Sequence, residues 1–433
     1  MTRAAPLLPS TTVEDAVACV VRHVRRCAAL QVEEVDLVAA HQRILAESLA
    51  SPWPMPAADV SMMDGWAVRS ADVAEAVAQQ AGAAVLTASG TTAAGHPPDR
   101  PLGPGQAGRI FTGAVLPAGA DAVVAQEDVD VDGTRVTVDP QACAALQPQR
   151  FVRARGSEVQ QGDIVATKGT RLGAGELALL ASAGHARVLV RRRPTVAILS
   201  TGDELVRLGQ QPGPGQLVSS NGIMLAAQVV EAGGEAIVLP EVRDDRDALR
   251  AALAQGLTAD VLLTSGGMSV GDHDLVREQL EALGVQIHVH GLALRPGKPT
   301  AFGTRGDTLV FGLPGNPAGS WVAFCLVVQP ALAARSGNAA MRGPMRLPVR
   351  VTTTIKGAGR RAHYVRARWA SPAPPAGSSE PRQATPLSVQ RSGNLRSVGG
   401  VELLLIVPVG VAAVQAGEIC DGLVLRAPAG EVS

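Results

Sequence analysis

The sequence predicts a multidomain α/β protein in which a parallel α/β domain is flanked by β-rich modules. Three observations support this fold class. Strand-like and helix-like segments alternate with short connections between about residues 191 and 338, a pattern typical of a parallel sheet. Short apolar runs separated by Gly and Pro occupy the segments before and after it. The length of 433 residues favours two to four domains.

The first 190 residues predict two modules, one of which is interrupted by the other. Thr12 and Asp15 form the start of a capping box, and a helix with apolar residues at helical spacing follows. A second short helix is expected over residues 34–49. Three prolines in residues 51–56 exclude both helix and central strand, so they mark a boundary. A β-rich segment follows, with a hairpin turn at Asp132-Gly133, and then a helix over 176–183 and a strand over 186–190. We therefore expect a discontinuous N-terminal helical and linker domain over 1–50 and 156–190, and a β-rich domain over 51–155.

The α/β domain is expected over 191–338 and a C-terminal β domain over 339–433. The helices of the α/β domain are predicted to begin at Ser220 or Asn221, at Asp244, at Asp274 and at Ala318. The predicted strands, each a short apolar or β-branched run, cover residues 195–200, 235–239, 261–264, 285–289 and 308–311.

Composition supports packed cores and argues against several classes of protein. Hydrophobic residues make up 46% of the chain but aromatic residues only 2%, so Ala, Val and Leu must build the cores. Lys plus Arg and Asp plus Glu both number 39, which gives no global attraction to nucleic acid or to a membrane surface. The five cysteines form no C-x-x-C pair, and no targeting segment is recognised, so a reduced, cytoplasmic setting is expected. The apolar stretch 321–332 is too short to span a membrane and predicts a buried helix.

Four glycine-containing loops follow strand ends in the α/β domain, at residues 200–203, 264–267, 295–299 and 313–317. Strand ends of a parallel sheet meet at one edge, and glycines let backbone N–H groups approach an anion closely. Each loop alone reads equally well as an ordinary turn, but four together favour a phosphate-bearing ligand. None matches the Walker A or G-x-G-x-x-G pattern, which disfavours a standard nucleotide fold.

Three further features carry charge. Asp272 and Asp274 flank His273 beside an anion loop. A carboxylate in this place can hold Mg²⁺ against phosphate oxygens. Alternatively, Asp274 only caps the next helix. Asp64 precedes Gly65 and, on pattern alone, is a turn residue. From residue 339 onward twelve basic residues accompany five acidic ones, which favours an anionic small molecule over a merely solvated basic face.

Taken in order, these motifs resemble the MoeA/gephyrin E-domain family over nearly the whole chain. The resemblance implies four subdomains, a three-layer α/β domain like that of MogA, a β-barrel-like C-terminal domain and an elongated homodimer. It also implies a molybdopterin molybdenumtransferase: adenylylated molybdopterin plus molybdate gives molybdenum cofactor and AMP, with Mg²⁺ as cofactor. The segments that carry it are M-D-G-W-A-V-R at 63–69, G-R-I-F-T-G-A at 108–114, A-V-V-A-Q-E-D at 122–128, S-T-G-D-E-L at 200–205, T-S-G-G-M-S-V-G-D at 264–272, R-P-G-K-P at 295–299 and L-P-G-N-P at 313–317.

The same resemblance assigns roles to residues. Asp64, Asp274 and Lys298 are the expected catalytic residues, with Asp64 reaching the cleft from the partner subunit. Asp274 and Asp272 are the expected metal ligands. The expected substrate-binding residues are those of the four loops together with one position in the β-rich domain and two positions in the basic C-terminal domain: Thr112, Thr201, Gly202, Asp203, Ser265, Gly266, Gly267, Ser269, Arg295, Pro314, Asn316, Pro317, Arg366 and Ser392.

Three features depart from the family pattern: Ser219 stands where many members have Asp, Glu158 stands where Asp is usual, and the loop from Ser371 to Gln383 is unusually rich in Pro and Ser. Three alternatives stay open at this point: a non-catalytic dimeric scaffold, the adenylyltransferase step, and tungstate in place of molybdate. The adenylyltransferase of the pathway is a further candidate partner, whereas nucleic acid and membrane are not expected.

Overall fold

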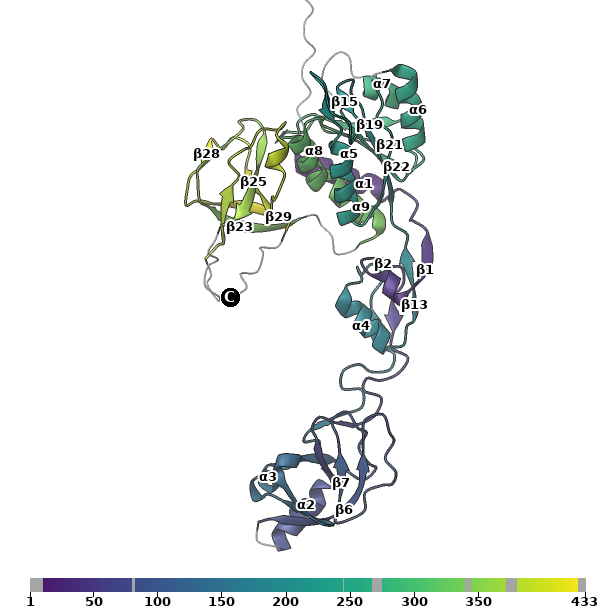
Figure 1. Cartoon of the computed structure of the whole chain (residues 1–433), viewed down its shortest axis with the longest axis vertical. Helices are drawn as coiled ribbons and strands as arrows, with labels where there is room; N and C mark the ends of the chain where they lie inside the picture. The colour runs from purple at the N-terminus through teal and green to yellow at the C-terminus, as the bar shows by residue number, and fades with distance from the viewer. Residues whose placement is uncertain are drawn as a thin grey trace, which may run out of the picture.

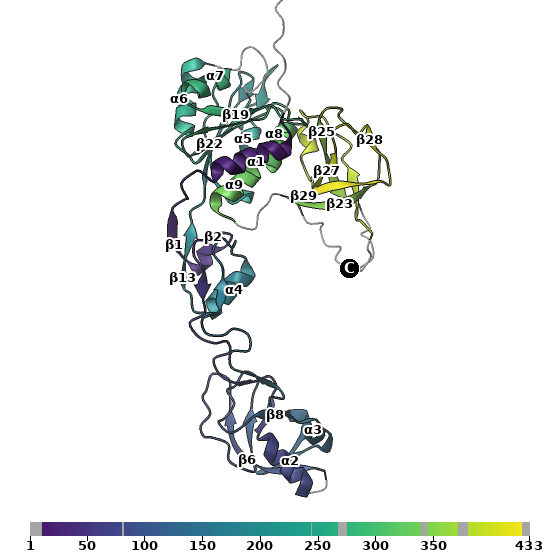
Figure 2. The same cartoon turned by 180° about the vertical axis from the view of Figure 1, so that it is seen from behind.

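The computed structural model describes residues 11–79, 82–243, 245–266, 275–338, 344–370 and 380–426. It is an elongated molecule of four parts (Figure 1). An α/β domain lies at one end with a C-terminal barrel beside it, a small middle module follows, and a β-rich arm (residues 51–155) lies at the other end (Figures 1 and 2). The predicted multidomain α/β class is confirmed.

The α/β domain is built on a sheet of order β17-β14-β18-β22-β21-β19. Strands β14 and β18 are parallel, with Val196 opposite Val261, as predicted. The sheet departs from an all-parallel arrangement at one edge, where β21, a strand that the sequence pattern did not predict, runs antiparallel to both β22 and β19. A short turn between β21 and β22 leaves no room for the crossover helix that a parallel connection needs. The strands are β14 (Thr195–Ser200), β17 (Glu235–Val238), β18 (Val261–Ser265), β19 (Gln286–His290), β21 (Ala301–Arg305) and β22 (Thr308–Leu313); β15 (Leu205–Val206) and β16 (Leu217–Val218) pair in the loop after β14.

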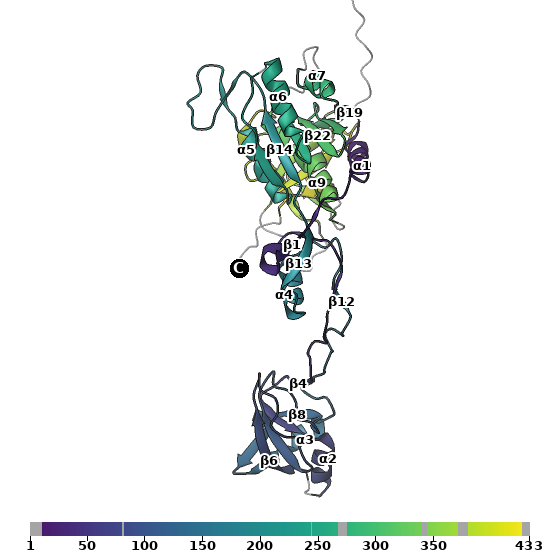
Figure 3. The same cartoon turned by 90° about the vertical axis from the view of Figure 1, so that its right-hand side faces the viewer.

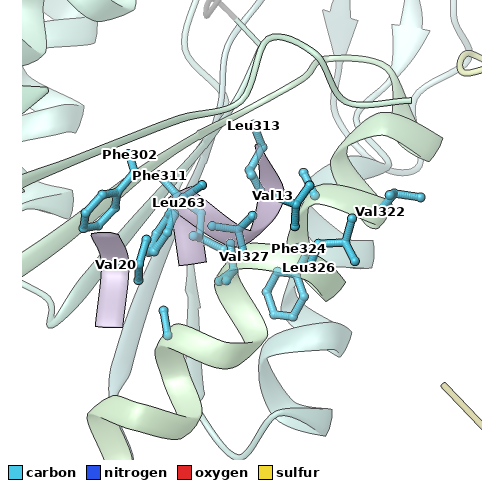
Figure 4. Packing of buried hydrophobic residues seen from close by; sticks show 14 of the residues in the cluster. Val13, Val20, Leu263, Phe302, Phe311, Leu313, Val322, Phe324, Leu326 and Val327 are labelled. Atoms are coloured by element: carbon cyan, nitrogen blue, oxygen red, sulfur yellow. The ribbon is translucent and has the colours of Figure 1, made fainter. Parts of the chain in front are cut away.

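Helices cover both faces of this sheet and make three layers. Alternate residues of β14 show it: Val196 and Ile198 join one core cluster, and Ala197 and Leu199 join the other. The first cluster contains residues of α1 (Val13–Val24), α5 (Asn221–Glu231), α8 (Pro317–Ala323) and α9 (Gln329–Ser336), some of them shown in Figure 4. The second contains residues of α6 (Arg246–Gly256) and α7 (Leu275–Ala282).

Helix α1 belongs to this core, which differs from the expected assignment of residues 1–50 to one N-terminal module. Thr12 caps it by accepting a hydrogen bond from the Asp15 N–H at 3.1 Å, as predicted. Its apolar face, with Val13 and Val20 among the buried residues, packs in the cluster of the α/β domain (Figure 4). The hydrophobic stripe of a helix must be covered, and α9 and the sheet supply the cover.

Helix α6 starts one residue later than expected, because Asp245 accepts the capping hydrogen bond from the Ala248 N–H. The continuous helical segment Pro317–Ser336 has the length and apolar composition of a membrane span, but 78% of its 18-residue window is buried inside the structure. It is the predicted buried core helix. A π-helical stretch, Phe324–Val328, links α8 to α9 within it.

The middle module is made by two stretches of chain far apart in sequence. Strands β1 (Val32–Asp36) and β2 (Ile44–Leu45) both pair with β13 (Arg187–Arg191), and β3 (Leu49–Ala50) pairs with β12 (Ile164–Ala166). The predicted helix over 34–49 is wrong, because pairing with β13 overrides the local helical preference. The helix predicted over 176–183 exists as α4 (Ala174–Ser182).

The arm contains a sheet of order β8-β5-β7-β6-β10-β9, with helices α2 (Ser70–Gln79) and α3 (Pro140–Ala145) (Figure 3). The hairpin turn predicted at Asp132-Gly133 joins β9 to β10. The two connections to the middle module run side by side, with Met55 bridged to Val159. The arm strands are β4 (Val60–Ser61), β5 (Gly65–Val68), β6 (Ala84–Thr92), β7 (Gln106–Ile110), β8 (Ala122–Ala125), β9 (Val129–Asp132), β10 (Arg135–Val138) and β11 (Val152–Arg153).

The C-terminal domain is a closed barrel-like sheet of order β20-β25-β26-β23-β29-β27, in which β27 pairs back to β25. Its first strand, β20 (Leu294–Arg295), comes from the α/β domain and ties the two parts together. The remaining strands are β23 (Met345–Val351), β24 (Ile355–Lys356), β25 (Ala362–Trp369), β26 (Gln383–Pro386), β27 (Leu403–Val407), β28 (Ala413–Val414) and β29 (Ile419–Val424).

Candidate functional site

The loops after β14, β18 and β22 lie together at one edge of the sheet, as predicted. The Thr201 N–H donates to the Ser265 carbonyl at 3.2 Å, and the Gly266 N–H donates to the Leu313 carbonyl at 3.3 Å. Gly266 has a φ of +95°, and a Cβ there would lie 2.5 Å from the Thr201 carbonyl oxygen. Only glycine therefore lets the first two loops approach so closely.

Asn221 joins these loops through its side chain, a role that sequence reasoning missed. Its Nδ2 donates to Ser265 Oγ at 2.8 Å and to the Gly315 carbonyl at 2.7 Å. Because a carbonyl only accepts, the second bond fixes which end of the amide is the donor. The Asn221 Oδ1 is buried and has no partner among the described residues, so it remains an acceptor for a ligand. The signal available in the sequence, a polar residue at a helix start, was interpreted only as a cap.

The basic loop at 295–299 stands between the α/β domain and the barrel. Arg295 and Lys298 are both exposed. Arg295 lies in β20 and is paired with His363 of the barrel strand β25. Gly297 has a φ of +111°, and its N atom lies 3.4 Å from the position of a Cβ at Gly319, so the loop packs directly on the start of α8.

The fourth loop also reaches the barrel. Asn316 precedes α8, and Pro317 is its first residue, where a missing N–H costs nothing. The Ser392 carbonyl of the barrel accepts a hydrogen bond from the Ala318 N–H at 3.0 Å. The structure thus brings the start of α8, with Asn316 and Pro317, beside Ser392 of the barrel.

Arg366 is the most unusual side chain of this region. It lies on β25 with no exposed surface, and its Nε, Nη1 and Nη2 atoms all lack a hydrogen-bond partner within the part of the chain that the structure describes. Burial, together with repulsion from Arg295, lowers the pKa of Arg366 to about 10. Burial also lowers the pKa of His363, whose Nδ1 lies 2.8 Å from the Lys356 carbonyl oxygen. A positive charge that has no counter-charge or partner among the described residues is therefore held between the barrel and the basic loop.

Asp64 and Thr112 form a separate pair in the arm. The Thr112 N–H and hydroxyl both donate to Asp64 Oδ1 at 2.7 Å, and these bonds lower the pKa of Asp64. Arg109 lies beside them and donates to the Gly65 carbonyl at 3.2 Å. Within one chain the arm lies at the opposite end of the molecule from the α/β domain (Figures 1 and 2), so this pair does not meet the loops.

Two known protein families match this chain, one over its N-terminal part and one over the α/β domain. The profile of the MoeA N-terminal region (domain I and II) matches residues 11–184, and that of a probable molybdopterin binding domain matches residues 197–334. A molybdopterin molybdenumtransferase of Nostoc is 38% identical over 98% of this chain and 95% of its own length.

The chain belongs to the MoeA family of molybdopterin molybdenumtransferases. Another such transferase, from Bacillus subtilis, is 33% identical over 92% of this chain and 90% of its own length. The MoeA protein of Pyrococcus horikoshii has a similar structure, with a TM-score of 0.78 and 31% identity over 96% of this chain and all of that one. Like these MoeA proteins, the chain is an enzyme of molybdenum cofactor biosynthesis.

Four predicted residues of this MoeA site lie outside the described residues, namely Gly267, Ser269, Asp272 and Asp274. Of the neighbouring loop after β14, Thr201 and Gly202 are buried and Asp203 is exposed. The described ranges contain no group of three His, Cys, Asp or Glu side chains arranged to hold a metal ion. Ser219, which departs from the family pattern, is buried directly before α5.

Proposed function

We propose that this enzyme inserts molybdenum from molybdate into adenylylated molybdopterin, giving molybdenum cofactor and AMP. The observation that carries the proposal is the Arg366 guanidinium, buried and without a partner beside Arg295. Burying a charge without compensation is costly, so a side chain kept in this state is best explained by an anionic ligand that supplies the missing charge. Molybdate, a compact dianion, suits that position.

The chain's own residues can do three things for this reaction. Arg295, Lys298 and Arg366 offset the repulsion between molybdate and the phosphates of the second substrate. The clustered loops, with Ser265 and Asn221 at their centre, orient the pterin phosphates so that its dithiolene faces the oxyanion. The dithiolene sulfurs are soft ligands that the substrate brings, so no cysteine is needed at the metal. No residue is assigned as a general base.

Mg²⁺ is part of the proposal as a cofactor. It usually keeps several waters and binds one or two carboxylates together with substrate phosphates, so a cluster of three protein ligands is not required. Asp274 and Asp272 are the residues proposed to bind the ion. Asp203 lies in the loop after β14, the strand next to β18, and is a further candidate ligand. When bound, the ion would neutralise phosphate charge during cleavage of the anhydride.

The proposal includes a homodimer, because the Asp64–Thr112 pair cannot reach the loops of its own chain. Exposed apolar side chains gather on α5 and the edge strand β17, which suits self-association. They are Ile223 (54% exposed), Val230 (56%), Ile237 (42%) and Val238 (46%). The compartment proposed is the cytoplasm, in keeping with five free cysteines.

The function is tested by incubating the protein with adenylylated molybdopterin, Mg²⁺ and either molybdate or tungstate, and measuring AMP release and cofactor formation. Oxyanion-dependent AMP release is expected. Release with tungstate but not molybdate would replace the metal in the proposal, and no release with either would favour the non-catalytic scaffold. Transfer of the adenylyl group from ATP to molybdopterin would instead support the adenylyltransferase step.

Mixing two inactive variants tests the shared site. Asp64→Asn removes the arm carboxylate and Lys298→Ala removes a loop cation. After random subunit exchange half of the dimers are heterodimers, and one of the two sites in each combines an intact arm with intact loops. Roughly a quarter of wild-type activity should therefore return. Activity that stays absent after subunit exchange would mean that Asp64 serves no site across a dimer. Light scattering on the wild type at micromolar concentration gives the independent check of the dimer.

A further inference from the structure

A second arginine cluster lies far from the Arg366 region, where the middle module meets the α/β domain. It surrounds a small hollow that is open to solvent. One wall carries the ends of two helices, Ala232-Gly233 after α5 and Ala333 and Ser336 of α9. The other wall carries five arginines: Arg43, Arg171, Arg191, Arg192 and Arg193.

Two of these five arginines have a carboxylate partner. Arg192 makes a two-pronged contact with Asp260 at 2.6 and 2.8 Å, and Arg43 pairs with Glu33. Arg191 donates only to a backbone carbonyl, that of Leu30, at 2.8 Å.

The remaining positive charge is not balanced by carboxylates of the described residues. The side chains of Arg171 and Arg193 make no ion pair or hydrogen bond with the described residues. The Arg43 Nε is buried without a partner, on a side chain that is only 11% exposed. Unpaired guanidinium groups thus converge on the hollow from the middle module and from the link between the two parts.

Helix ends explain only part of this accumulation. The C-terminus of each helix carries a partial negative charge of about half a unit, which favours nearby arginines. Two such ends offset roughly one positive charge, whereas three arginines lack a carboxylate partner. The helix ends also leave the buried Arg43 Nε without an acceptor.

We infer that this hollow is a second oxyanion site, separate from the active site, that takes a small multivalent oxyanion of the phosphate or molybdate type. Several guanidinium groups around an anion give charge-assisted hydrogen bonds, which are the strong ones. Arg43 and Arg171 belong to the middle module, and Arg193 leads directly into β14 of the α/β domain. A bound anion therefore joins the two parts and stiffens the junction from which the arm extends.

The test uses the full-length chain carrying Arg366→Met, so that oxyanion binding beside Arg295 in the active site is weakened. Inorganic phosphate and molybdate are titrated separately by calorimetry at low ionic strength. Either phosphate or molybdate should still bind to this protein. Adding Arg171→Gln and Arg193→Gln should weaken that binding at least tenfold. The matched control is Arg187→Gln, an exposed arginine on the same module that pairs with Glu34 at 3.1 Å. It should leave binding unchanged.

The two oxyanions distinguish the source of the ligand. Binding of phosphate alone supports a phosphorylated ligand, and competition by molybdate supports a reserve of the substrate oxyanion. If no oxyanion binds to the Arg366→Met protein, or if the doubly substituted protein binds as tightly as the Arg187→Gln control, the arginines only stabilise the helix ends and the inference is overturned. Circular dichroism confirms that each variant is folded. None of these readouts depends on AMP release, so the outcome is independent of the proposed function.

Discussion

Two buried arginines of this protein live in opposite surroundings. Arg335, near the end of α9, has a side chain that is 6% exposed and lies 3.5 Å from Asp260, and it donates to the Ala28 carbonyl at 2.5 Å. Arg366, on β25, is at least as deeply buried but has no partner among the described residues. The Arg335 Nε also lacks a partner among the described residues, but its two Nη groups have Ala28 and Asp260 as partners. A guanidinium that the fold pairs with a carboxylate holds elements together. One that the fold leaves unsatisfied marks a place where something else must supply the charge.

Arg366→Met breaks the comparison most sharply, because activity and stability should move in opposite directions. Removing the cation should lower AMP formation at low molybdate on the order of 10²–10³-fold. Removing an unpaired buried charge while keeping the apolar stem should leave the unfolding temperature unchanged or raise it. Steady-state assays and thermal unfolding measure the two effects. A variant that loses stability but keeps its rate would show that Arg366 is a structural residue.

Asp260→Asn tests the satisfied side of the comparison. Asp260 serves Arg192 and Arg335 and also accepts from the Thr195 N–H at 2.8 Å. Losing its charge leaves two cations near each other and should lower the free energy of unfolding by about 3 kcal/mol. Urea unfolding measures it, with the exposed Arg246–Glu278 pair as control: Glu278→Gln should cost less than about 1 kcal/mol. Equal losses in the two variants would contradict a special role for burial.

Asp274→Asn tests the second source of charge compensation in the proposed reaction. Arg366 is proposed to balance the oxyanion, whereas Mg²⁺ bound by Asp274 is proposed to balance the substrate phosphates. The rate of AMP release should fall on the order of 10²-fold, while binding of the pterin is retained. Asn caps a helix about as well as Asp, so a residue that only caps would tolerate the change. Wild-type turnover at saturating Mg²⁺ would move the proposed metal contact to Asp272 or Asp203.

The smallest effect expected is in the pH dependence of stability. Burial alone would raise the pKa of Asp260, but hydrogen bonds from Arg192 and Thr195 outweigh it and lower the pKa. A group with a lowered pKa stabilises the fold above its unfolded pKa of about 3.9, and that stabilisation is lost as pH falls further. The difference in unfolding free energy between wild type and Asp260→Asn should therefore be constant near neutrality and shrink below about pH 4. A difference that does not change with pH would contradict this assignment.

The sequence was sufficient for the strand ends but not for the contacts between them. Apolar runs located β14, β18 and β22, and their glycine loops predicted an anion site at one edge. The role of Asn221 could not be found in this way, because its two partners lie 44 and 94 residues away and meet it only in the folded chain. The antiparallel strand β21 was missed for a similar reason, since strand direction depends on how the connection fits the sheet.

The sequence also did not predict which charged side chain is buried. Arginine is usually exposed, so twelve basic residues in the last segment predicted an anion but could not reveal which one loses its contact with water. The resemblance to the family selected Arg366, and the structure supplies the physical reason to single it out. The arginines around this hollow come from three separate segments of the chain, at residues 43, 171 and 191–193, and no local pattern predicted that these segments meet.

The position of α1 sets a timing problem for the growing chain. Its apolar face is formed within the first 24 residues, but α9, which helps to cover it, ends only at Ser336. At a synthesis speed of about 5–20 residues per second, roughly 15–60 s pass on the ribosome before that cover exists. The arm, whose strand pairings are complete by Arg153, can fold during this interval. The N-terminal helix is therefore the segment of the nascent protein most in need of a temporary binding partner, such as a chaperone.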